Sequence, residues 1–576
     1  MVNWTLDNPV VTKELRGRMR GARTYWLLFG YLFLLSLLFF FWYLGWWSSH
    51  SNAMQNGAAS ASFTAGRMFF KVLFYAQAVM IALITPALTA GAISVEREQR
   101  TFEMLRSTVL KPRSIVWGKL VSSVSFVVLL LTSSLPLLSL CFLLGGVSPG
   151  EVFFAYLLLA GDAFLFGAIG LCWSAYAANT ATATVLSYAT LIAFFAATFP
   201  FAIPALDDGG SIPFYGLCAL NPVGAVTGAV MPEHYFGWTL PAWIPALLLN
   251  GTLSLLLVLA SINRLEDYPA RCAAGLRGVT LLLAGLLMFF GEGIVLGQGP
   301  MVGTSPSALA MLAAAIPCTL LLLFVPVLVT GDREDWKTAA SWPLRVFRSA
   351  TLPSGLPFAL LLTALVVGMT LAASHLAFQP LSMAMQRGQS FRAPLQSAAA
   401  AAGANPNLLV DMFEQAGLML LFVVIGIAGV GYLLSVLLGN RWSSLTLLYV
   451  GLLLAVALPF FSYANLSGLD ARAAASSPAI NTLYFCPYVP LMQLTEPQAS
   501  NLYKDSATPG MIGYGVVPLW IGTGGLYLTL GLVAYGVAFL VVRKKKVGQE
   551  GTGGVGTGGE GTGEARRAGA SPAPTG

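Results

Sequence analysis

Few side chains of this sequence could do chemistry, because only 10% of its 576 residues are charged and three are histidine. His50, His234 and His375 are scattered along the chain, without the spacing of metal ligands. The six cysteines form no CxxC pair or other ligand spacing. A membrane-embedded enzyme needs a cluster of His, Asp or Glu near an interface. We therefore predict no catalytic residue, and no metal or cofactor bound by this chain.

Two carboxyl groups lie inside long apolar stretches, where ionisable side chains are costly and usually serve a function. Asp162 is flanked by Gly161 and Gly167, which allow neighbouring helices to approach closely. It is a candidate intramembrane polar site, and Glu292 is a weaker one. For both residues the sequence favours a plainer interpretation, a carboxyl group hydrogen-bonded to a neighbouring helix. Neither has a counterpart in the other half of the chain, which argues against a symmetric proton relay.

The densest group of charges falls in one short segment between two apolar stretches. It combines charged residues with small and apolar ones: Glu96, Arg97, Glu98, Arg100, Thr101, Phe102, Glu103 and Leu105. Pro112 ends this segment before the next apolar stretch. A charged face beside an apolar edge predicts a helix that lies against the membrane and binds a soluble partner. The alternative is a solvated loop whose basic residues only fix the topology.

The stretches that flank these residues define the fold class. The chain is 56% hydrophobic with a mean hydropathy of +0.74, whereas about a quarter of the residues in soluble domains are charged. Its long apolar runs differ from the short alternating strands of a β-barrel. We predict an all-α polytopic membrane protein with about 12 transmembrane helices, each long enough to cross a bilayer. The stretches are 24–47, 67–94, 115–144, 152–177, 180–205, 238–262, 278–297, 305–330, 355–378, 409–438, 443–464 and 513–542.

The distribution of Lys and Arg predicts the orientation of these helices. With the amino terminus inside, the inner segments hold 25 of the 31 basic residues, and the outer segments hold the other six. Both termini are therefore predicted to be cytoplasmic. This distribution fits membrane topology better than nucleic-acid binding, which needs one basic groove with aromatic residues. Residues 547–576 are rich in Gly, Thr, Ala and Pro and are predicted to form a disordered cytoplasmic tail.

The two halves of the chain resemble each other weakly. Tyr188 follows Asn179 by nine residues, and Tyr449 follows Asn440 by the same spacing. Each pair lies where the fourth and fifth stretches of its half meet. We predict two parallel six-helix domains related by an axis normal to the membrane. The alternative is chance similarity between apolar segments. The predicted domains are 1–262 and the more diverged 263–546.

The charged segment resembles the signature of the ABC-2 type transporter permeases. Members of that family carry Glu-Arg/Lys-Glu, then Thr, an acidic residue and Leu, then Pro and a Gly-Lys pair that opens the next span. The matching residues here are Glu96-Arg97-Glu98, Thr101, Glu103, Leu105, Pro112 and Gly118-Lys119. The segment 8–16 is similar to the amphipathic start of the family. Arg100 departs from the pattern, because Gly is common at its position. The resemblance covers 8–262 well and the second half faintly.

This resemblance implies a transmembrane subunit of an ATP-driven ABC transporter, most often an exporter, in a plasma (prokaryotic inner) membrane. The cytoplasmic loop 95–113 would couple it to separate ATP-binding subunits. Its charged residues would contact the ATPase through polar bonds, and Phe102 and Leu105 through apolar ones. The partners would hold ATP and Mg, since this sequence contains no Gly-x-x-x-x-Gly-Lys-Ser/Thr phosphate loop. A chain that fuses two membrane domains would bind two such subunits, and a chain that does not could form a homodimer.

Three further interpretations stay open at this point. Asp332, Arg333 and Glu334 form a possible second coupling loop, although the later acidic residue and the Gly-Lys pair are missing there. Cys218 and Cys486 both fall in outer segments, where a disulfide is conceivable. The alternatives to an ABC permease are a secondary transporter driven by an ion gradient, which needs paired midplane acids or broken helices, and a membrane scaffold or enzyme.

Overall fold

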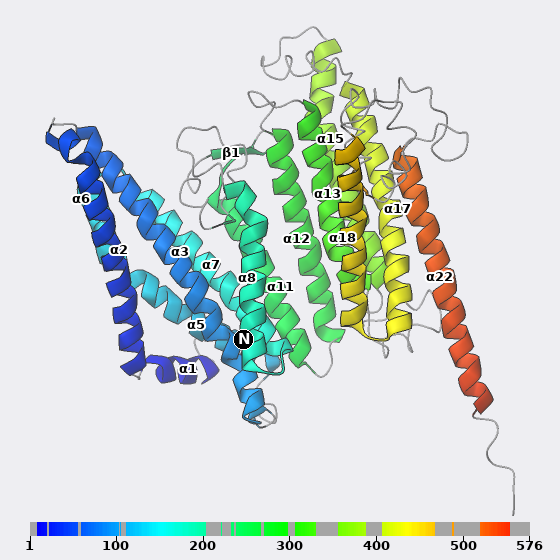
Figure 1. Cartoon of the computed structure of the whole chain (residues 1–576), viewed down its shortest axis with the longest axis horizontal. Helices are drawn as coiled ribbons and strands as arrows, with labels where there is room; N and C mark the ends of the chain where they lie inside the picture. Colours follow the sequence, from blue (N-terminus) through cyan, green and yellow to red (C-terminus); the bar gives the residue numbers. More distant parts are fainter. Residues whose placement is uncertain are drawn as a thin grey trace, which may run out of the picture.

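The fold was analysed in a computed structural model. The structure describes residues 9–19, 22–55, 59–102, 104, 111–202, 220–221, 232–235, 238–266, 270–297, 306–329, 355–386, 406–466, 486–488 and 519–552. Within these residues, eight helices are long and apolar enough to cross a membrane, and four shorter apolar helices accompany them. Most of the helices stand side by side in one bundle (Figure 1). The chain is therefore a helical, multi-pass membrane protein.

The described part of the amino-terminal half contains eight helices, four of which pack against α7. They are α1 (Pro9–Met19), α2 (Ala22–Gln55), α3 (Ala59–Glu98), α5 (Pro112–Ser133), α6 (Leu135–Leu144), α7 (Pro149–Tyr176), α8 (Thr180–Ala202) and α11 (Trp243–Leu265). α7 contacts α3, α5, α8 and α11. It begins with a capping box, in which Ser148 Oγ accepts from the Glu151 main chain and Glu151 accepts from that of Ser148.

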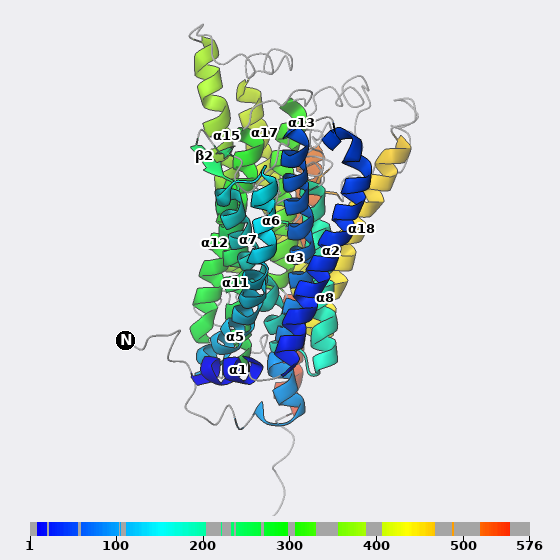
Figure 2. The ribbon, with the colours of Figure 1, turned by 90° about the vertical axis from the view of Figure 1, so that its left-hand side faces the viewer.

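Helix α1 has a different direction from the others. It lies across one end of the bundle, crosswise to α2 (Figures 1 and 2), and it packs against α5. Its first turn buries Val10, whereas Lys13 and Arg16 are exposed. An amphipathic helix of this kind is suited to a membrane surface. We call this end of the bundle the α1 end.

The helices of the carboxyl-terminal half are α12 (Ala270–Gly297), α13 (Pro306–Val329), α15 (Gly355–Gln386), α17 (Pro406–Leu438), α18 (Arg441–Leu466) and α22 (Leu519–Thr552). The closest approach is between α17 and α22. A Cβ atom added to Gly426 would lie 2.5 Å from the Tyr527 carbonyl oxygen, and one added to Gly531 would lie 2.7 Å from that of Ile425. Small residues at such positions let helix backbones touch within a membrane.

Large apolar side chains are found both on the outer surface of the bundle and in its interior, as expected for a protein in lipid. Large apolar side chains on α2 are exposed, among them Phe29 and Phe41 at 58% and 61%. The interior of the first half holds fully buried aromatic residues, including Phe69, Phe74 and Phe166. Where a bilayer replaces water, apolar side chains on the outer surface carry no penalty, so this exposure fits a membrane location.

The structure corrects three boundaries. The predicted span 115–144 is not one helix, because it breaks at Ser134 between α5 and α6. Pro136 has no N–H to bond the carbonyl four residues earlier, which explains the break. The predicted span 238–262 begins as a strand: β1 (Pro232–Tyr235) pairs antiparallel with β2 (Trp238–Pro241), and α11 starts only at Trp243. Helix α22 continues to Thr552, past the predicted start of the tail at 547.

Candidate functional site at the end of helix α3

The charged segment singled out in the sequence begins inside α3 and continues beyond its last turn. α3 ends at Glu98 with two characteristic main-chain bonds, from Thr101 N to Glu96 O at 2.9 Å and from Arg100 N to Arg97 O at 3.1 Å. These bonds define a Schellman motif. Arg100 occupies its left-handed position, with φ of 58°. Glycine is preferred there because a Cβ atom crowds the backbone, which gives a physical meaning to the departure noted in the sequence.

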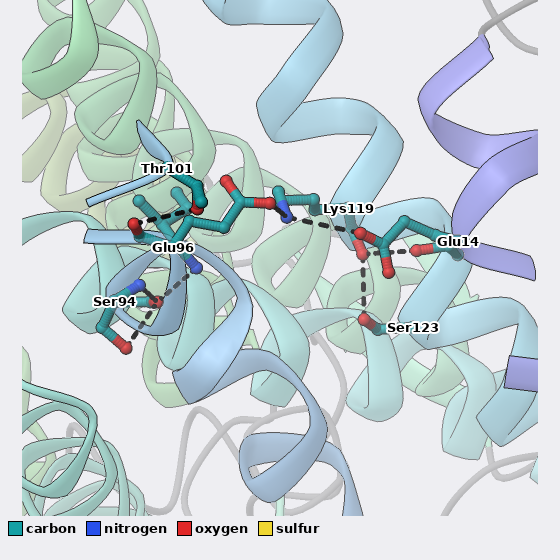
Figure 3. A network of polar contacts seen from close by, with 9 residues as sticks. Glu14, Ser94, Glu96, Thr101, Lys119 and Ser123 are labelled. Atoms are coloured by element: carbon teal, nitrogen blue, oxygen red, sulfur yellow. Dashed lines mark hydrogen bonds and ion pairs between the residues drawn. The ribbon is translucent and has the colours of Figure 1, made fainter. Parts of the chain in front are cut away.

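Glu96 points into the bundle and forms an ion pair with α5. Its Oε1 lies 2.7 Å from Lys119 Nζ, and Glu14 Oε1 of α1 lies 3.4 Å from the same nitrogen. Figure 3 shows the Lys119 ammonium between the two carboxylates. The Lys119 side chain is only 6% exposed, and those of Glu96 and Glu14 are 27% and 28% exposed. One buried cation thus connects α1, α3 and α5.

Arg97 joins α3 to the end of α7. Its guanidinium donates from Nη1 to the Ala177 carbonyl at 2.6 Å and from Nη2 to the Ala175 carbonyl at 3.1 Å. The last carbonyls of a helix lack partners within the helix and carry partial negative charge. Arg97 supplies both the missing donors and the opposite charge. The Phe102 ring covers the guanidinium, with its centroid 5.7 Å from Arg97 Cζ.

Glu98 joins α3 to the start of α8. Its Oε1 accepts a hydrogen bond of 2.7 Å from the main-chain nitrogen of Thr180. Thr180 is the first residue of α8. The first N–H groups of a helix are also without partners inside the helix, and a carboxylate there is stabilised by the helix dipole. Glu98 therefore acts on α8 as Arg97 acts on α7.

Two small residues of α7, Ser174 and Gly170, hold the preceding turns of α3. Ser174 Oγ of α7 accepts from the main-chain nitrogens of Ile93 and Ser94 at 2.9 and 3.0 Å. One turn earlier, Gly170 of α7 faces Thr89 of α3 so closely that an added Cβ would overlap the threonine hydroxyl. The end of α3 is thus fixed to α7 by close packing as well as by hydrogen bonds.

The residues predicted for the coupling loop divide into two groups. Glu96, Arg97 and Glu98, which we call the root, are bonded to other helices of this chain. Beyond them lies the tip, whose exposed members are Gln99, Arg100, Thr101 and Met104. Met104 is 73% exposed, a high value for an apolar side chain. Phe102 is half-buried against Arg97. Glu103 and Leu105, like Asp332, Arg333 and Glu334 of the possible second loop, lie outside the described residues.

The sequence analysis did not predict the residues that form ion pairs and hydrogen bonds with the end of α3. Lys119 was noted only as part of a Gly-Lys pair, and Ser174 and Thr180 were not singled out. A signal for Lys119 was present, because a lysine that lies inside an apolar stretch needs a nearby anion. No signal marks the carbonyls of Ala175 and Ala177, since main-chain acceptors exist at every residue.

The bonds of the root join five helices, α1, α3, α5, α7 and α8, at the α1 end, and we call this set of contacts the joint. Within the described parts of the chain, no group of three or more His, Cys, Asp or Glu residues could hold a metal ion.

The two intramembrane carboxyl groups lie on different helices and are not among the residues of this joint. Asp162 of α7 is 1% exposed and accepts a 2.9 Å hydrogen bond from Asn250 Nδ2 of α11. Glu292 of α12 is equally buried. Cys486 is buried, and Cys218 lies outside the residues that the structure describes, so the disulfide between them stays a prediction.

A scan against models of protein families finds no match for this sequence, and a search of curated proteins finds none either. The function is therefore argued from the geometry of the site.

Proposed function

We propose that this chain is the membrane-embedded permease of an ATP-driven transporter of the ABC-2 type, working as an exporter. One observation carries the proposal: the end of α3 has an exposed tip and a root whose three charges are bonded to neighbouring helices. A membrane protein whose helices are moved by a soluble ATPase needs an exposed surface to which the ATPase can bind. It also needs a rigid connection from that surface to the transmembrane helices.

In this mechanism the tip binds a separate ATPase. Arg100 supplies a positive charge for an acidic group of the partner, and Met104 supplies an adaptable apolar side chain for a pocket. When ATP closes the motor, the tip is displaced together with the end of α3. The root transmits this displacement through Arg97 to α7, through Glu98 to α8, and through Lys119 to α5 and α1. The helices of the first half then move as a unit and open a path outward.

The proposal includes twelve spans, although eight helices meet the length criterion among the described residues. The four shorter apolar helices, Thr180–Ala196, Ala315–Leu328, Phe358–Ser374 and Ser443–Ala457, fall within four of the predicted spans. Together with the eight longer helices they account for all twelve predicted stretches. This agreement supports the higher number.

The proposal also includes a parallel six-helix repeat. Tyr188 Oη of α8 donates to the Leu83 carbonyl of α3 at 2.5 Å, and Tyr449 Oη of α18 donates to the Leu323 carbonyl of α13 at 2.5 Å. In each half, a tyrosine of the fifth span thus bonds the main chain of the second span. Packing agrees as well, because the fourth span contacts the second, third, fifth and sixth in both halves. These matched contacts favour a repeat over chance similarity.

The orientation and location follow from the same proposal. A tip that grips an ATPase lies in the cytoplasm, which places the α1 end and both termini there. The membrane is the plasma membrane, or the inner membrane of a prokaryote. ATP and Mg are held by the partner subunits, one at the first loop and a second if residues 332–334 also couple. The chain itself contributes no nucleotide site.

Variants of the tip and the root test this proposal because they separate binding from coupling. The chain is reconstituted in nanodiscs with the ATPase encoded beside it, and both binding and ATP hydrolysis are measured. Arg100→Glu combined with Met104→Asp is expected to weaken binding at least about tenfold, corresponding to about 1.4 kcal/mol. Glu96→Ala combined with Glu98→Ala, which removes the acceptors for Lys119 and for the Thr180 main chain, is expected to leave binding intact but to abolish the effect of the permease on hydrolysis.

Arg543→Glu provides a matched control, because Arg543 is an exposed basic residue of α22 outside the proposed contact. It is expected to change neither binding nor hydrolysis. The proposal fails if the tip variant binds the ATPase as tightly as the unaltered chain. It also fails if no ATPase with a phosphate loop binds the unaltered chain.

A further inference from the structure

Asp162 and Asn250 form an isolated polar pair between α7 and α11. The two side chains are 1% and 2% exposed. Asn250 Nδ2 donates to Asp162 Oδ1 at 2.9 Å. The remaining oxygen of each residue, Asp162 Oδ2 and Asn250 Oδ1, is buried and has no hydrogen-bond partner among the described residues. Buried polar atoms are rarely left without a partner, so two on adjoining side chains require an explanation.

No charged group of the described residues lies at the level of Asp162 on the helices that pack against α7. On α3, Gln77 bonds Tyr156 and Thr89 faces Gly170, so the segment opposite Asp162 is 77–89. That segment contains no titratable residue. On α5, Leu120 lies beside Gly167, and the adjoining Ser134 bonds Tyr156. The segment 120–134 between them also contains no titratable residue.

The other two neighbours of α7 give the same result. On α8, the Phe195 ring packs against Phe166, and residues 190–202 include no titratable group. On α11, Leu247 packs against Gly161, and residues 243–263 include none either. Along α7 itself the nearest titratable residues are Tyr156 and Cys172. A charged carboxylate at this position would therefore have no counter-ion, which is a costly arrangement inside a membrane.

A single proton resolves both problems. On Asp162 Oδ2 it removes the buried charge and converts that oxygen into a donor. The acceptor without a partner, Asn250 Oδ1, belongs to the amide that already bonds the other carboxyl oxygen. We propose that Asp162 and Asn250 form a proton-binding site, in which the proton completes a second hydrogen bond from the carboxyl group to the amide. A carboxylic acid and an amide make a cyclic pair of this kind, in which both oxygens that lack a partner are bonded and the second N–H of the amide stays outside the ring.

The position of the pair connects it to the second half of the chain. Asn250 follows Leu249, which packs with Leu283 and Phe290 of α12. Asp162 is 1% exposed, so its proton exchanges with water only when the packing around the pair opens. An opening between α7 and α11 would also move the surface of α11 on which α12 packs. This inference does not depend on the proposed function.

Infrared spectroscopy of the full chain in nanodiscs at neutral pH tests the proposal. The carbonyl stretch of a protonated carboxylic acid is distinct from the bands of a carboxylate. We expect such a band in the unaltered chain, its loss in Asp162→Asn, and its retention in Glu292→Gln, which removes the other carboxyl group that is buried among the described residues. In Asn250→Leu the band should remain but shift to higher frequency, because the carboxyl group loses its amide partner.

The same spectra can overturn the proposal. It is wrong if the band is absent from the unaltered chain, or if Asp162→Asn leaves the carboxylic acid region unchanged. If Asp162→Asn does not fold, the proposal is tested by comparing the frequency of the band in the unaltered chain with that in Asn250→Leu. A band at the same frequency in both then excludes the hydrogen bond to the amide. Slow exchange of the proton in heavy water is a further expectation, and complete exchange within the mixing time would contradict the enclosed site.

Discussion

Replacing Lys119 by Met should destabilise the end of α3, and the structure allows the size of the effect to be worked out. Met keeps the length of the side chain and its apolar contacts but removes the charge shared by Glu96 and Glu14. The Glu96 carboxylate, 2.7 Å from Lys119 Nζ, then loses its cation while remaining 27% exposed. Breaking a fully buried pair costs about 3–5 kcal/mol, and breaking an exposed pair costs about 0.2–1 kcal/mol. The Lys119–Glu96 pair is intermediate in exposure. We therefore expect Lys119→Met to lower the free energy of unfolding by about 2 kcal/mol.

A double-mutant cycle isolates the part of this cost that belongs to each pair. Glu96→Gln in the Lys119→Met background removes the carboxylate that was left without a cation, so the double variant should be more stable than Lys119→Met alone. The coupling free energy between Lys119 and Glu96 is expected to be about 2 kcal/mol. The contact with Glu14 is longer, at 3.4 Å. Its coupling with Lys119 should be about 1 kcal/mol or less.

The assay is denaturant-induced unfolding in detergent micelles, combined with hydrogen exchange of the main-chain amides at 93–101. The exchange readout reports the local opening of the α3 end even if global unfolding is not reversible. Lys544→Met is the control, since Lys544 is an exposed residue of α22, and its effect should stay within about 0.5 kcal/mol. The reasoning is refuted if the effects of Lys119→Met and Glu96→Gln on the free energy of unfolding are additive. It is also refuted if amide hydrogen exchange at 93–101 is unchanged in Lys119→Met.

Three more predictions concern the same joint. Arg100→Gly should stabilise the chain by about 1 kcal/mol, because Arg100 has a φ of 58°; an unchanged midpoint of unfolding would contradict this. Gly170→Ala should destabilise it by about 1–3 kcal/mol, since the new Cβ would meet Thr89, whereas Gly251→Ala on α11 has open space and should be neutral or stabilising. Glu98→Ala should cost about 1 kcal/mol and speed amide exchange in the first turn of α8, while Glu98→Gln, which keeps an acceptor for Thr180 N, should cost less.

The features of the fold that depend on apolar runs could be predicted from the sequence. Span 152–177 matches α7 closely, because a bilayer requires a continuous apolar stretch and the flanking Ser148 and Glu151 form a cap. The break at Ser134 was missed, although Pro136 is a visible signal for it. The strands β1 and β2 were missed because their pairing depends on contacts between two short segments, which leave no periodic pattern.

The contact of Glu96, Arg97 and Glu98 with a partner protein stays a prediction. Their bonds to other helices of this chain were not predictable from the sequence. The partners of Arg97 and Glu98 are main-chain atoms 78 to 82 residues away. Only the packing of α3 against α7 and α8 brings these groups together, and no side-chain type marks them in advance.

The central claim is that the root of α3 transmits the action of an ATPase bound at the tip. The most direct test measures the ATP hydrolysis of the partner in complex with the chain in nanodiscs, comparing the unaltered chain with Glu96→Ala/Glu98→Ala at saturating binding. The account predicts that the variant binds the ATPase with unchanged affinity and no longer alters its rate of hydrolysis. A variant that binds equally well and still alters the rate as the unaltered chain does would contradict it.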